Sequence, residues 1–332
     1  PWIKNPSYTT VTYSVILEDF WGGVGNNTLS DPMFVSAIHY NDAPTTEGNY
    51  RVFQGSPAID AGNNDAVNLP EKDLDGEPRI QGDNDDGEKV VDMGAYEGGQ
   101  EAPLFRVGTV AMEHARTWEP NFENLQDALA ASGPAIQIWV AAGIYYPDSG
   151  CAEAEIDKNK CSFEIPNGVK VYGGFAGGEL TPDDRAKSDK NDDGIIEDWE
   201  FTNETILSGD IERNDENGDN NYIAETHDDI IGSNAYHVVI LEYVSEETVL
   251  DGFTITAGDA NGPERLNYDK GGGIYNSHGS PILTNCIEWG NDPGISSSSG
   301  VITYSNIEGG WDGVGNIDSH PHFVKGVDPG SA

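Results

Sequence analysis

The sequence predicts an all-β protein, folded as a right-handed parallel β-helix. Between residues 247 and 291, short runs of β-branched and aliphatic residues recur at close intervals. Gly, Asn and Asp close each run, and no helical period fits between one run and the next. Strands this short and this near in sequence suit a solenoid, in which each coil pairs with the coil before it and the coil after it.

The predicted coils are clearest in three runs, at residues 249–255, 274–275 and 282–287. Two long acidic stretches, 183–200 and 210–229, interrupt the strand pattern. We interpret both as Asp-rich loop insertions, which leave the coils and return to them.

One helix stands out from this strand-and-turn pattern, over residues 121–132. Its apolar residues share one face, Asn121 is the expected N-cap, and Gly133 followed by Pro134 ends it. The helix directly precedes the apolar strand 136–140. We therefore expect an N-terminal capping helix that covers the open end of the solenoid.

An internal repeat divides the chain. Residues 11–35 and 301–324 share, in the same order, a Thr-Tyr-Ser phrase, a Trp-x-Gly-Val-Gly-Asn turn and a Pro-x-Phe-Val phrase. We therefore assign residues 1–50 to the last coil of a preceding β-helix repeat and residues 51–104 to an Asp/Gly-rich tail or cap module. Residues 105–332 form a second β-helix.

Composition excludes several classes of partner. The 332 residues include 58 acidic and 17 basic side chains, with a formal charge of −41, which would repel nucleic acid and anionic membranes. No run approaches the roughly 18–20 apolar residues that cross a bilayer. The chain opens with Pro1 and carries no signal peptide, so we expect a portion of a longer protein. An acidic surface attracts cations, although a simply soluble exterior is the alternative for most of these residues.

Several phrases resemble known families. TILSGD (205–210), YHVVI (236–240) and TVLDGFTITAG (248–258) resemble secreted bacterial β-helix proteins of the pectate-lyase-like superfamily. SPAIDAGN (56–63), and the later phrases DLDGEPRI and VDMGAYE, resemble the tail segment of choice-of-anchor Q domain proteins. The resemblance implies a β-helix with a helical cap, and an extracellular or bacterial cell-surface location. It says little about activity.

The sharpest local motif is a calcium loop of the EF-hand type at residues 189–200. The match to that pattern covers six loop positions. Oxygen side chains lie at positions one, three and five, and Gly194 lies at position six. Position eight is apolar and position twelve is Glu. Alternate residues point oxygens inward, and Gly permits the sharp turn. The flanks are too short and polar for an entering helix, and a solvated acidic loop is the alternative. The predicted ligands are Asp189, Asn191, Asp193, the Ile195 carbonyl, Glu197 and Glu200.

A second calcium candidate lies in the other insertion, at Asp210, Asp215, Asn217 and Asp219. Its spacing matches no standard loop, so a mobile acidic insertion is an equal alternative. Hard oxygen ligands without clustered His or Cys favour Ca²⁺ over zinc or copper in both places.

The cysteines and two tryptophans complete the predicted sites. Cys151 and Cys161 bracket a polar loop, where a disulfide would suit an oxidising, extracellular setting. Two free thiols are the alternative. Cys286 lies within a strand and is expected to be a small buried filler. Trp21 and Trp311 hold equivalent repeat positions and either stack on sugars or pack over a coil edge.

We therefore predict a secreted structural or adhesive surface module, stabilised by calcium and assembled in tandem or end to end into a fibre. Its partners would be other copies of itself or cell-surface glycans, with neither nucleic acid nor membrane insertion. The alternative is a carbohydrate-active β-helix enzyme, a polysaccharide lyase or glycoside hydrolase, or a carbohydrate-binding module. The sequence designates no catalytic residue, which leans against an enzyme.

Overall fold

The structure is a computed structural model of the chain. It describes residues 12–15, 26–28, 32–36, 48–80, 89–108, 121–151, 157–189, 194–321 and 323. The chain divides into two compact units, residues 1–102 and 103–332. No helix in the described part of the chain is long and apolar enough to cross a membrane.

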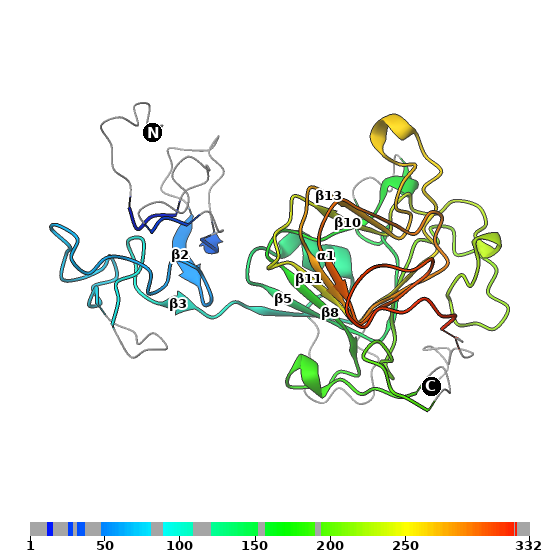
Figure 1. Ribbon diagram of the computed structural model, residues 1–332, viewed down its shortest axis with the longest axis horizontal. Coiled ribbons are helices and arrows are strands. Elements are labelled where there is room, and N and C mark those ends of the chain that lie inside the picture. Colours follow the sequence, from blue (N-terminus) through cyan, green and yellow to red (C-terminus); the bar gives the residue numbers. More distant parts are fainter. Residues whose placement is uncertain are drawn as a thin grey trace. The chain divides into compact units, whose positions relative to one another are not determined.

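The larger unit contains three parallel sheets (Figure 1). The first sheet comprises β7 (Phe163–Glu164), β10 (Val239–Glu242), β13 (Ile274–Ser277) and β16 (Ile295–Ser297). The second comprises β4 (Leu104–Val107), β5 (Gln137–Ala141), β8 (Lys170–Phe175), β11 (Val249–Asp251), β14 (Ile282–Thr284) and β17 (Val301–Thr303). The third comprises β6 (Gly143–Tyr145), β9 (Thr205–Ser208), β12 (Thr254–Thr256), β15 (Ile287–Glu288) and β18 (Asn306–Ile307). Short 3-10 turns lie at Lys158–Lys160, Pro182–Asp184, His227–Asp229 and Glu264–Leu266.

Strand order confirms the predicted parallel β-helix. The chain visits the three sheets in turn, as β10, β11 and β12, then β13, β14 and β15, then β16, β17 and β18. Every pairing within these sheets is parallel, and each strand bonds to the strand one coil away; Leu250, for example, lies opposite Leu283 on one side and Val171 on the other. Stacked coils bury side chains between them, and in β9 and β12 every residue is buried.

One corner of the coil explains the recurrent turn residues. Between the second and third sheets the backbone enters the left-handed region in three successive coils, at Gly252 (φ +83°), Asn285 (φ +55°) and Tyr304 (φ +49°). Gly and Asn adopt this conformation at the lowest cost. A Cβ at Gly252 would also lie 2.6 Å from the Arg185 guanidinium. The Gly and Asn that end the predicted runs are therefore favoured by the corner, and Tyr304 takes the same conformation in the last of the three coils.

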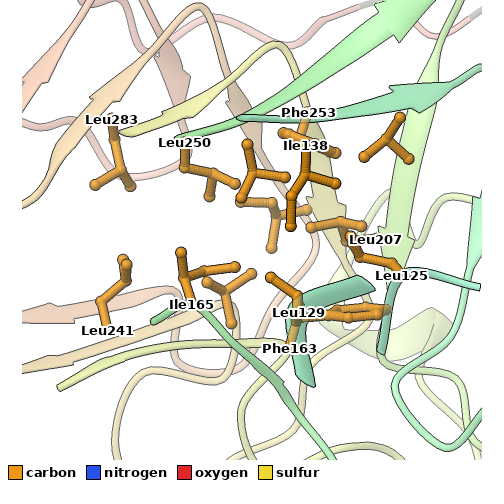
Figure 2. Close-up of a cluster of buried hydrophobic side chains, with 14 of the residues drawn as sticks. Leu125, Leu129, Ile138, Phe163, Ile165, Leu207, Leu241, Leu250, Phe253 and Leu283 are labelled. Atoms are coloured by element: carbon orange, nitrogen blue, oxygen red, sulfur yellow. The ribbon is translucent and has the colours of Figure 1, made fainter. Parts of the chain in front are cut away.

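The core lies between the sheets as stacked columns of aliphatic side chains. In the second sheet one column runs through Ile138, Val171, Leu250, Leu283 and Ile302, all almost fully buried. Figure 2 shows the Leu250 and Leu283 side chains facing Ile165 and Leu241 across this core. The columns supply the apolar burial that stabilises a narrow solenoid.

The capping helix exists but is shorter than predicted. Helix α1 spans Leu125–Ala131, and its N-cap is Asn124, whose side chain accepts a hydrogen bond from the Asp127 amide. The prediction of Asn121 as N-cap was wrong because Asn121 extends the strand edge: its amide donates to the Arg106 carbonyl and its side-chain oxygen accepts from the Arg106 amide. Three buried residues of the helix, Leu125, Ala128 and Leu129, join the core cluster.

The smaller unit is built around a three-stranded sheet. Strand β2 (Asn49–Phe53) pairs antiparallel with β1 (Phe34–Ser36) and parallel with β3 (Gly99–Gln100). A buried ion pair joins Arg79 Nη1 to Glu97 Oε1 at 2.8 Å. Burial, followed by the neighbouring Asp92 carboxylate, raises the pKa of Glu97 to about 7.

The internal repeat folds alike in both units. In the first copy the Ser14 amide donates to Asn27 Oδ1 at 3.1 Å, and the amide after Asn27 donates to the Ser14 carbonyl. In the second copy the Ser305 amide donates to Asn316 Oδ1 at 3.1 Å, and the amide after Asn316 donates to the Ser305 carbonyl. The repeated phrase therefore encodes one local structure.

Candidate functional site

A polar pocket of about 150 Å³ lies at the edge of the third sheet. Its walls come from segments far apart in the sequence: Tyr146 after β6, Ser208 at the end of β9, the insertion that follows β9, and Ala257 after β12. The insertion contributes the carboxylates Asp210, Asp215 and Glu216, together with Arg213, Asn217, Tyr222, Ile223 and Ala224. The pocket thus combines carboxylate, guanidinium, hydroxyl and aromatic groups.

Hydrogen bonds hold the insertion firmly against the coils. The Ala224 amide donates to Thr256 Oγ1 at 3.1 Å, and that hydroxyl donates back to the Ala224 carbonyl. Trp289 Nε1 donates to the Glu225 carbonyl at 3.1 Å. A Cβ at Gly290 would lie 1.8 Å from the Ala224 carbonyl oxygen, so only Gly permits this approach. The pocket is therefore formed before any ligand arrives, which lowers the entropic cost of binding.

Two carboxylates of the pocket are fixed by the surrounding backbone. Asp210 accepts hydrogen bonds from the amides of Asn214 and Asp215, at 3.1 and 3.2 Å. Asp215 accepts from the Ile231 amide at 2.7 Å and from Asn234 Nδ2 at 2.8 Å. Burial raises the pKa of Asp215 to about 6, and the nearby Asp210 carboxylate adds to the rise. Asp215 consequently changes its charge close to neutral pH.

The pocket's arginine is already paired. Arg213 Nη2 lies 2.6 Å from Asp148 Oδ1, and the guanidinium stacks over the Tyr146 ring at 3.8 Å from its centroid. The same guanidinium donates to the carbonyls of Asp210 and Ile211. Burial raises the pKa of Tyr146 to about 12, so its hydroxyl stays protonated and can donate a hydrogen bond.

The residues of the second calcium candidate make hydrogen bonds within their own insertion. Asn217 Oδ1 accepts from the Tyr222 amide, while the Asp219 carboxylate turns back to Asn221. In the described part of the chain, no group of three or more His, Cys, Asp or Glu side chains is arranged to hold a metal ion. The structure brings Asp210, Asp215 and Asn217 to one pocket but leaves Asp219 outside its lining. The spacing of these residues in the sequence does not reveal which of them line the pocket.

The first calcium loop is a closed hairpin whose ends are well defined. An antiparallel bridge joins Lys187 to Phe201, and the Ser188 amide donates to the Glu200 carbonyl at 3.0 Å. Two of the predicted ligands, Asn191 and Asp193, lie outside the described residues. The loop therefore begins and ends on a strand-like stem, and the flank before it contains the short 3-10 turn at Pro182–Asp184.

Within this loop two of the predicted ligands accept hydrogen bonds from loop amides. The Gly194 amide donates to Asp189 Oδ2 at 2.8 Å, which joins loop positions six and one. The Glu197 amide donates to Glu200 Oε2 at 2.9 Å, which joins positions nine and twelve. Ile195 exposes 61% of its surface, so its side chain points away from the loop. These contacts join carboxylates near both ends of the loop to amides of the same loop.

The loop is tied to the solenoid through its last residues. Trp199 packs in one cluster with Ile287 and Trp289 on the third sheet. Glu200, next in sequence, is completely buried. Phe201 lies beneath the guanidinium of Arg185, 4.4 Å from ring centroid to Cζ. Order in the loop is therefore coupled to packing on the coils.

A buried ion pair that sequence reasoning missed lies on the second sheet. Arg185 Nη1 is 3.1 Å from Asp251 Oδ1, and both side chains are about nine-tenths buried. The same Arg185 nitrogen donates to the Gly173 carbonyl at 2.8 Å, while Asn285 Nδ2 donates to Asp251 Oδ1. The pair anchors the calcium-loop insertion to the solenoid. Nothing in the local spacing links residues 185 and 251.

The cysteines and tryptophans occupy defined places. Cys151 and Cys161 form a disulfide. Cys286 is buried in the core, as predicted, and burial raises its pKa to about 12. Trp311 packs against the core cluster, which favours the packing interpretation over sugar stacking. Trp21 lies outside the described residues.

Comparison with known proteins gives little beyond the fold. No protein-family profile and no curated protein matches the sequence. Among solved structures, the chain is similar to pectin methylesterase PemA from Erwinia chrysanthemi, with a TM-score of 0.29 and 10% identity over 63% of this chain and 50% of that one. A pectin methylesterase mutant in complex with a hexasaccharide gives a TM-score of 0.30 and 10% identity, over 61% and 48%. The chain spans about half the length of these structures.

Proposed function

We propose that the chain is an extracellular β-helix surface module that binds glycans through the polar pocket and is stabilised by calcium. The observation that carries this proposal is the preformed pocket, in which fixed carboxylates, a tyrosine hydroxyl and a second tyrosine meet on a rigid scaffold. Sugars are held by carboxylate and hydroxyl hydrogen bonds and by contact with aromatic rings. The pocket offers both kinds of contact.

The fixed state of its carboxylates favours binding over turnover. Asp210 and Asp215 each accept two hydrogen bonds from their own loop and its neighbour. A nucleophile or base in a hydrolase must reach the reacting atom with its oxygens, and these restraints limit that reach. A rigid site of this kind suits adhesion, where the ligand is retained without being changed.

Calcium would rigidify the insertion at residues 189–200. The described carboxylates fit the group, because Asp189 and Glu200 already accept hydrogen bonds from amides inside the same loop. Asp189, Glu197 and Glu200, with the Ile195 carbonyl, would hold the ion alongside Asn191 and Asp193. Hard oxygen donors of this kind are the ligands that Ca²⁺ prefers. When bound, the ion would neutralise several of the chain's excess negative charges.

The extracellular location is supported by the disulfide between Cys151 and Cys161, since disulfides persist in oxidising compartments. Tandem or end-to-end assembly with other copies is supported by the internal repeat, whose two copies make the same hydrogen bonds. Electron microscopy at high calcium and protein concentration tests the assembly. Isolated particles under those conditions would remove fibre formation from the proposal.

A glycan panel with product analysis tests the main function. We expect retention on at least one immobilised glycan, with neither new reducing ends nor unsaturated products after prolonged incubation. Loss of retention in Tyr222→Ala, with retention kept in Tyr243→Ala, would locate binding in the pocket; Tyr243 is 72% exposed and lies outside it. No retention on any glycan would contradict the proposal.

A hydrolase is the second candidate, and one observation favours it. The pKa of Asp215 is raised to about 6 beside Asp210, and a proton-donating acid next to a second carboxylate is the arrangement of glycoside hydrolases. The product assay separates the two functions. New reducing ends that disappear in Asp215→Asn would establish hydrolysis.

A further inference from the structure

We propose that the pocket takes an amino sugar, a sugar residue with a free primary ammonium group, and that Asp210 and Asp215 receive the ammonium. This inference rests on the glycan-binding function proposed above and narrows it to one class of sugar. It follows from the charge, the geometry and the size of the pocket.

The lining carries uncompensated negative charge. Asp210, Asp215 and Glu216 face one cation, Arg213, in the described lining. The Arg213 guanidinium already forms an ion pair with Asp148, with Nη2 2.6 Å from Oδ1. Asp148 lies outside the lining. The ligand therefore meets three carboxylates whose charge no protein cation balances within the pocket. A uronate or sulfated sugar would be repelled, and a cationic sugar attracted.

The two fixed carboxylates keep room for further donors. A carboxylate offers about four acceptor positions, and Asp210 and Asp215 each use two of them on protein N–H groups. An ammonium group supplies three donors on one nitrogen. Charge-assisted hydrogen bonds of this kind are about twice as strong as neutral ones.

The geometry selects an organic cation over a metal ion. Six to eight oxygens surround a bound Ca²⁺, whereas an ammonium group has three donors to satisfy. Asn217 Oδ1, which would be a further ligand, is occupied by the Tyr222 amide. Two carboxylates at one side of a pocket suit a group that needs few contacts.

The pocket's size and aromatic groups select a single sugar residue. Its volume of about 150 Å³ is below the roughly 300–1,000 Å³ of sites for drug-sized ligands. Tyr222 lines the pocket, and its backbone is in the left-handed conformation (φ +64°) with its amide bonded to Asn217. The Tyr146 ring is covered by Arg213. Tyr222 is thus the aromatic group open to a ligand in the described lining.

The test compares two matched oligosaccharides by calorimetry, using the full chain with calcium present. A glucosamine tetramer carries ammonium groups, and the N-acetylglucosamine tetramer lacks them but keeps the rings and hydroxyls. At pH 7 we expect the glucosamine tetramer to bind at least about tenfold more tightly, the factor that one charge-assisted contact contributes.

Three variants test whether the glucosamine tetramer binds at the pocket carboxylates. Asp215→Asn should lower affinity for the glucosamine tetramer about tenfold or more. Glu216→Gln should lower it about threefold, since it removes charge and none of the hydrogen bonds that the structure shows for the insertion. The control Asp219→Asn removes a carboxylate from the same insertion, outside the lining, and should change affinity less than about twofold.

Each outcome decides between the proposals. Equal or tighter binding of the N-acetylated tetramer would overturn the amino-sugar inference and leave glycan binding intact. Binding of neither tetramer, with no other glycan retained, would remove both. A trilysine peptide that binds as tightly as the glucosamine tetramer, with the same loss in Asp215→Asn, would replace the sugar with a lysine side chain of a protein partner.

Discussion

Glu288 occupies a position that the fold reserves for an apolar side chain. In the third sheet Glu288 lies in register between Ile255 and Ile307, in a column that also contains Leu207. These three hydrophobic neighbours are almost fully buried. Its Oε1 accepts from Asn291 Nδ2 at 2.8 Å. Its Oε2 has no hydrogen-bond partner in the described part of the chain. We predict that Glu288→Gln, which keeps the shape and removes the charge, stabilises the protein at neutral pH.

The expected magnitude follows from the pKa. Burial, the largest cause, raises the pKa of Glu288 from 4.5 to about 8. At pH 7 Glu288 keeps its proton in the folded chain, whereas in the unfolded chain it loses the proton at about pH 4.5. The assay pH therefore lies about 2.5 units above the unfolded-state pKa. At about 1.4 kcal/mol per unit, this costs about 3 kcal/mol of unfolding free energy relative to a group that does not titrate. In a domain of this size that corresponds to about 6–12 °C in Tm.

The sign of the pH dependence is distinctive. Because the folded-state pKa is the higher one, the stability associated with Glu288 is fully present below about pH 4.5 and declines as pH rises to about 8. Most acidic residues act in the opposite sense. Thermal unfolding of both proteins by circular dichroism, in half-unit steps from pH 4.5 to 8.5, should give Tm values that coincide at the acid end and separate steadily toward pH 8.

The control is Glu242→Gln, an exposed carboxylate on the outer face of β10. Its Tm should follow that of the unaltered protein at every pH, because the Glu242 side chain is exposed and lies outside the buried column. If Glu288→Gln also ran parallel to the unaltered protein from pH 5 to 8, Glu288 would be ionised in the folded state. The placement of its side chain inside the column would then be incorrect.

Three further perturbations have defined outcomes. Asp251→Asn should lower the unfolding free energy by about 3 kcal/mol in urea titrations, because it leaves the buried Arg185 guanidinium without its charge partner. Replacing Cys151 and Cys161 together by Ser should cost about 2–4 kcal/mol in the same assay. Asn316→Ala removes an acceptor and two donors to backbone groups, and should cost about 1–3 kcal/mol and raise amide exchange in the last coil.

Each of these has a result that contradicts it. Asp183→Asn, an exposed neighbour in sequence of the ion pair, should be neutral, and equal losses for it and Asp251→Asn would mean that general charge and not the pair matters. If reductant did not change the unfolding midpoint of the unaltered protein, the disulfide would contribute nothing. Unchanged exchange in Asn316→Ala would show that the repeated phrase is not held by its Asn.

The solenoid could be predicted because its strands and corners leave a local signature. Each coil needs apolar residues on one face of short strands and a left-handed residue at the corner, and positions such as Gly252 and Asn285 supply the latter directly. Helix α1 was located by its apolar face, but its start was not, because Asn121 and Asn124 are equally good caps in isolation. Asn121 is engaged by Arg106, a contact made only once the strand edge exists.

The pocket was beyond sequence reasoning for a physical reason. Its walls meet only when the insertion packs on the third sheet, which places Tyr146, Ser208 and Tyr222 together. The spacing of the acids at 210–219 suggested a metal, and it gave no sign of the hydrogen bonds that Asp210 and Asp215 accept. Glu288 escaped notice because a strand of two residues, Ile287 and Glu288, gives no period from which to tell the inner face from the outer one.

The calcium loop and the pocket are linked through one coil, and this makes a final prediction. Trp199 of the calcium-loop insertion packs in a cluster with Trp289, and Trp289 Nε1 donates to the Glu225 carbonyl of the pocket insertion. A ligand that orders one insertion therefore restrains the other through Trp289. Coupling of this kind is reciprocal, so calcium should tighten glycan binding by the same factor by which the glycan tightens calcium binding.

Calorimetric titration of each ligand with and without the other measures that factor. We expect about five- to tenfold, the lower part of the range seen for coupled sites. Trp289→Phe keeps an aromatic ring in the cluster but removes the indole donor, so it should preserve calcium affinity and bring the factor toward one. A factor that stays the same in this variant would show that the two insertions communicate by another route, through charge or through the coils themselves. A factor of one in the unaltered protein would mean that the two sites are independent, whatever they share in packing.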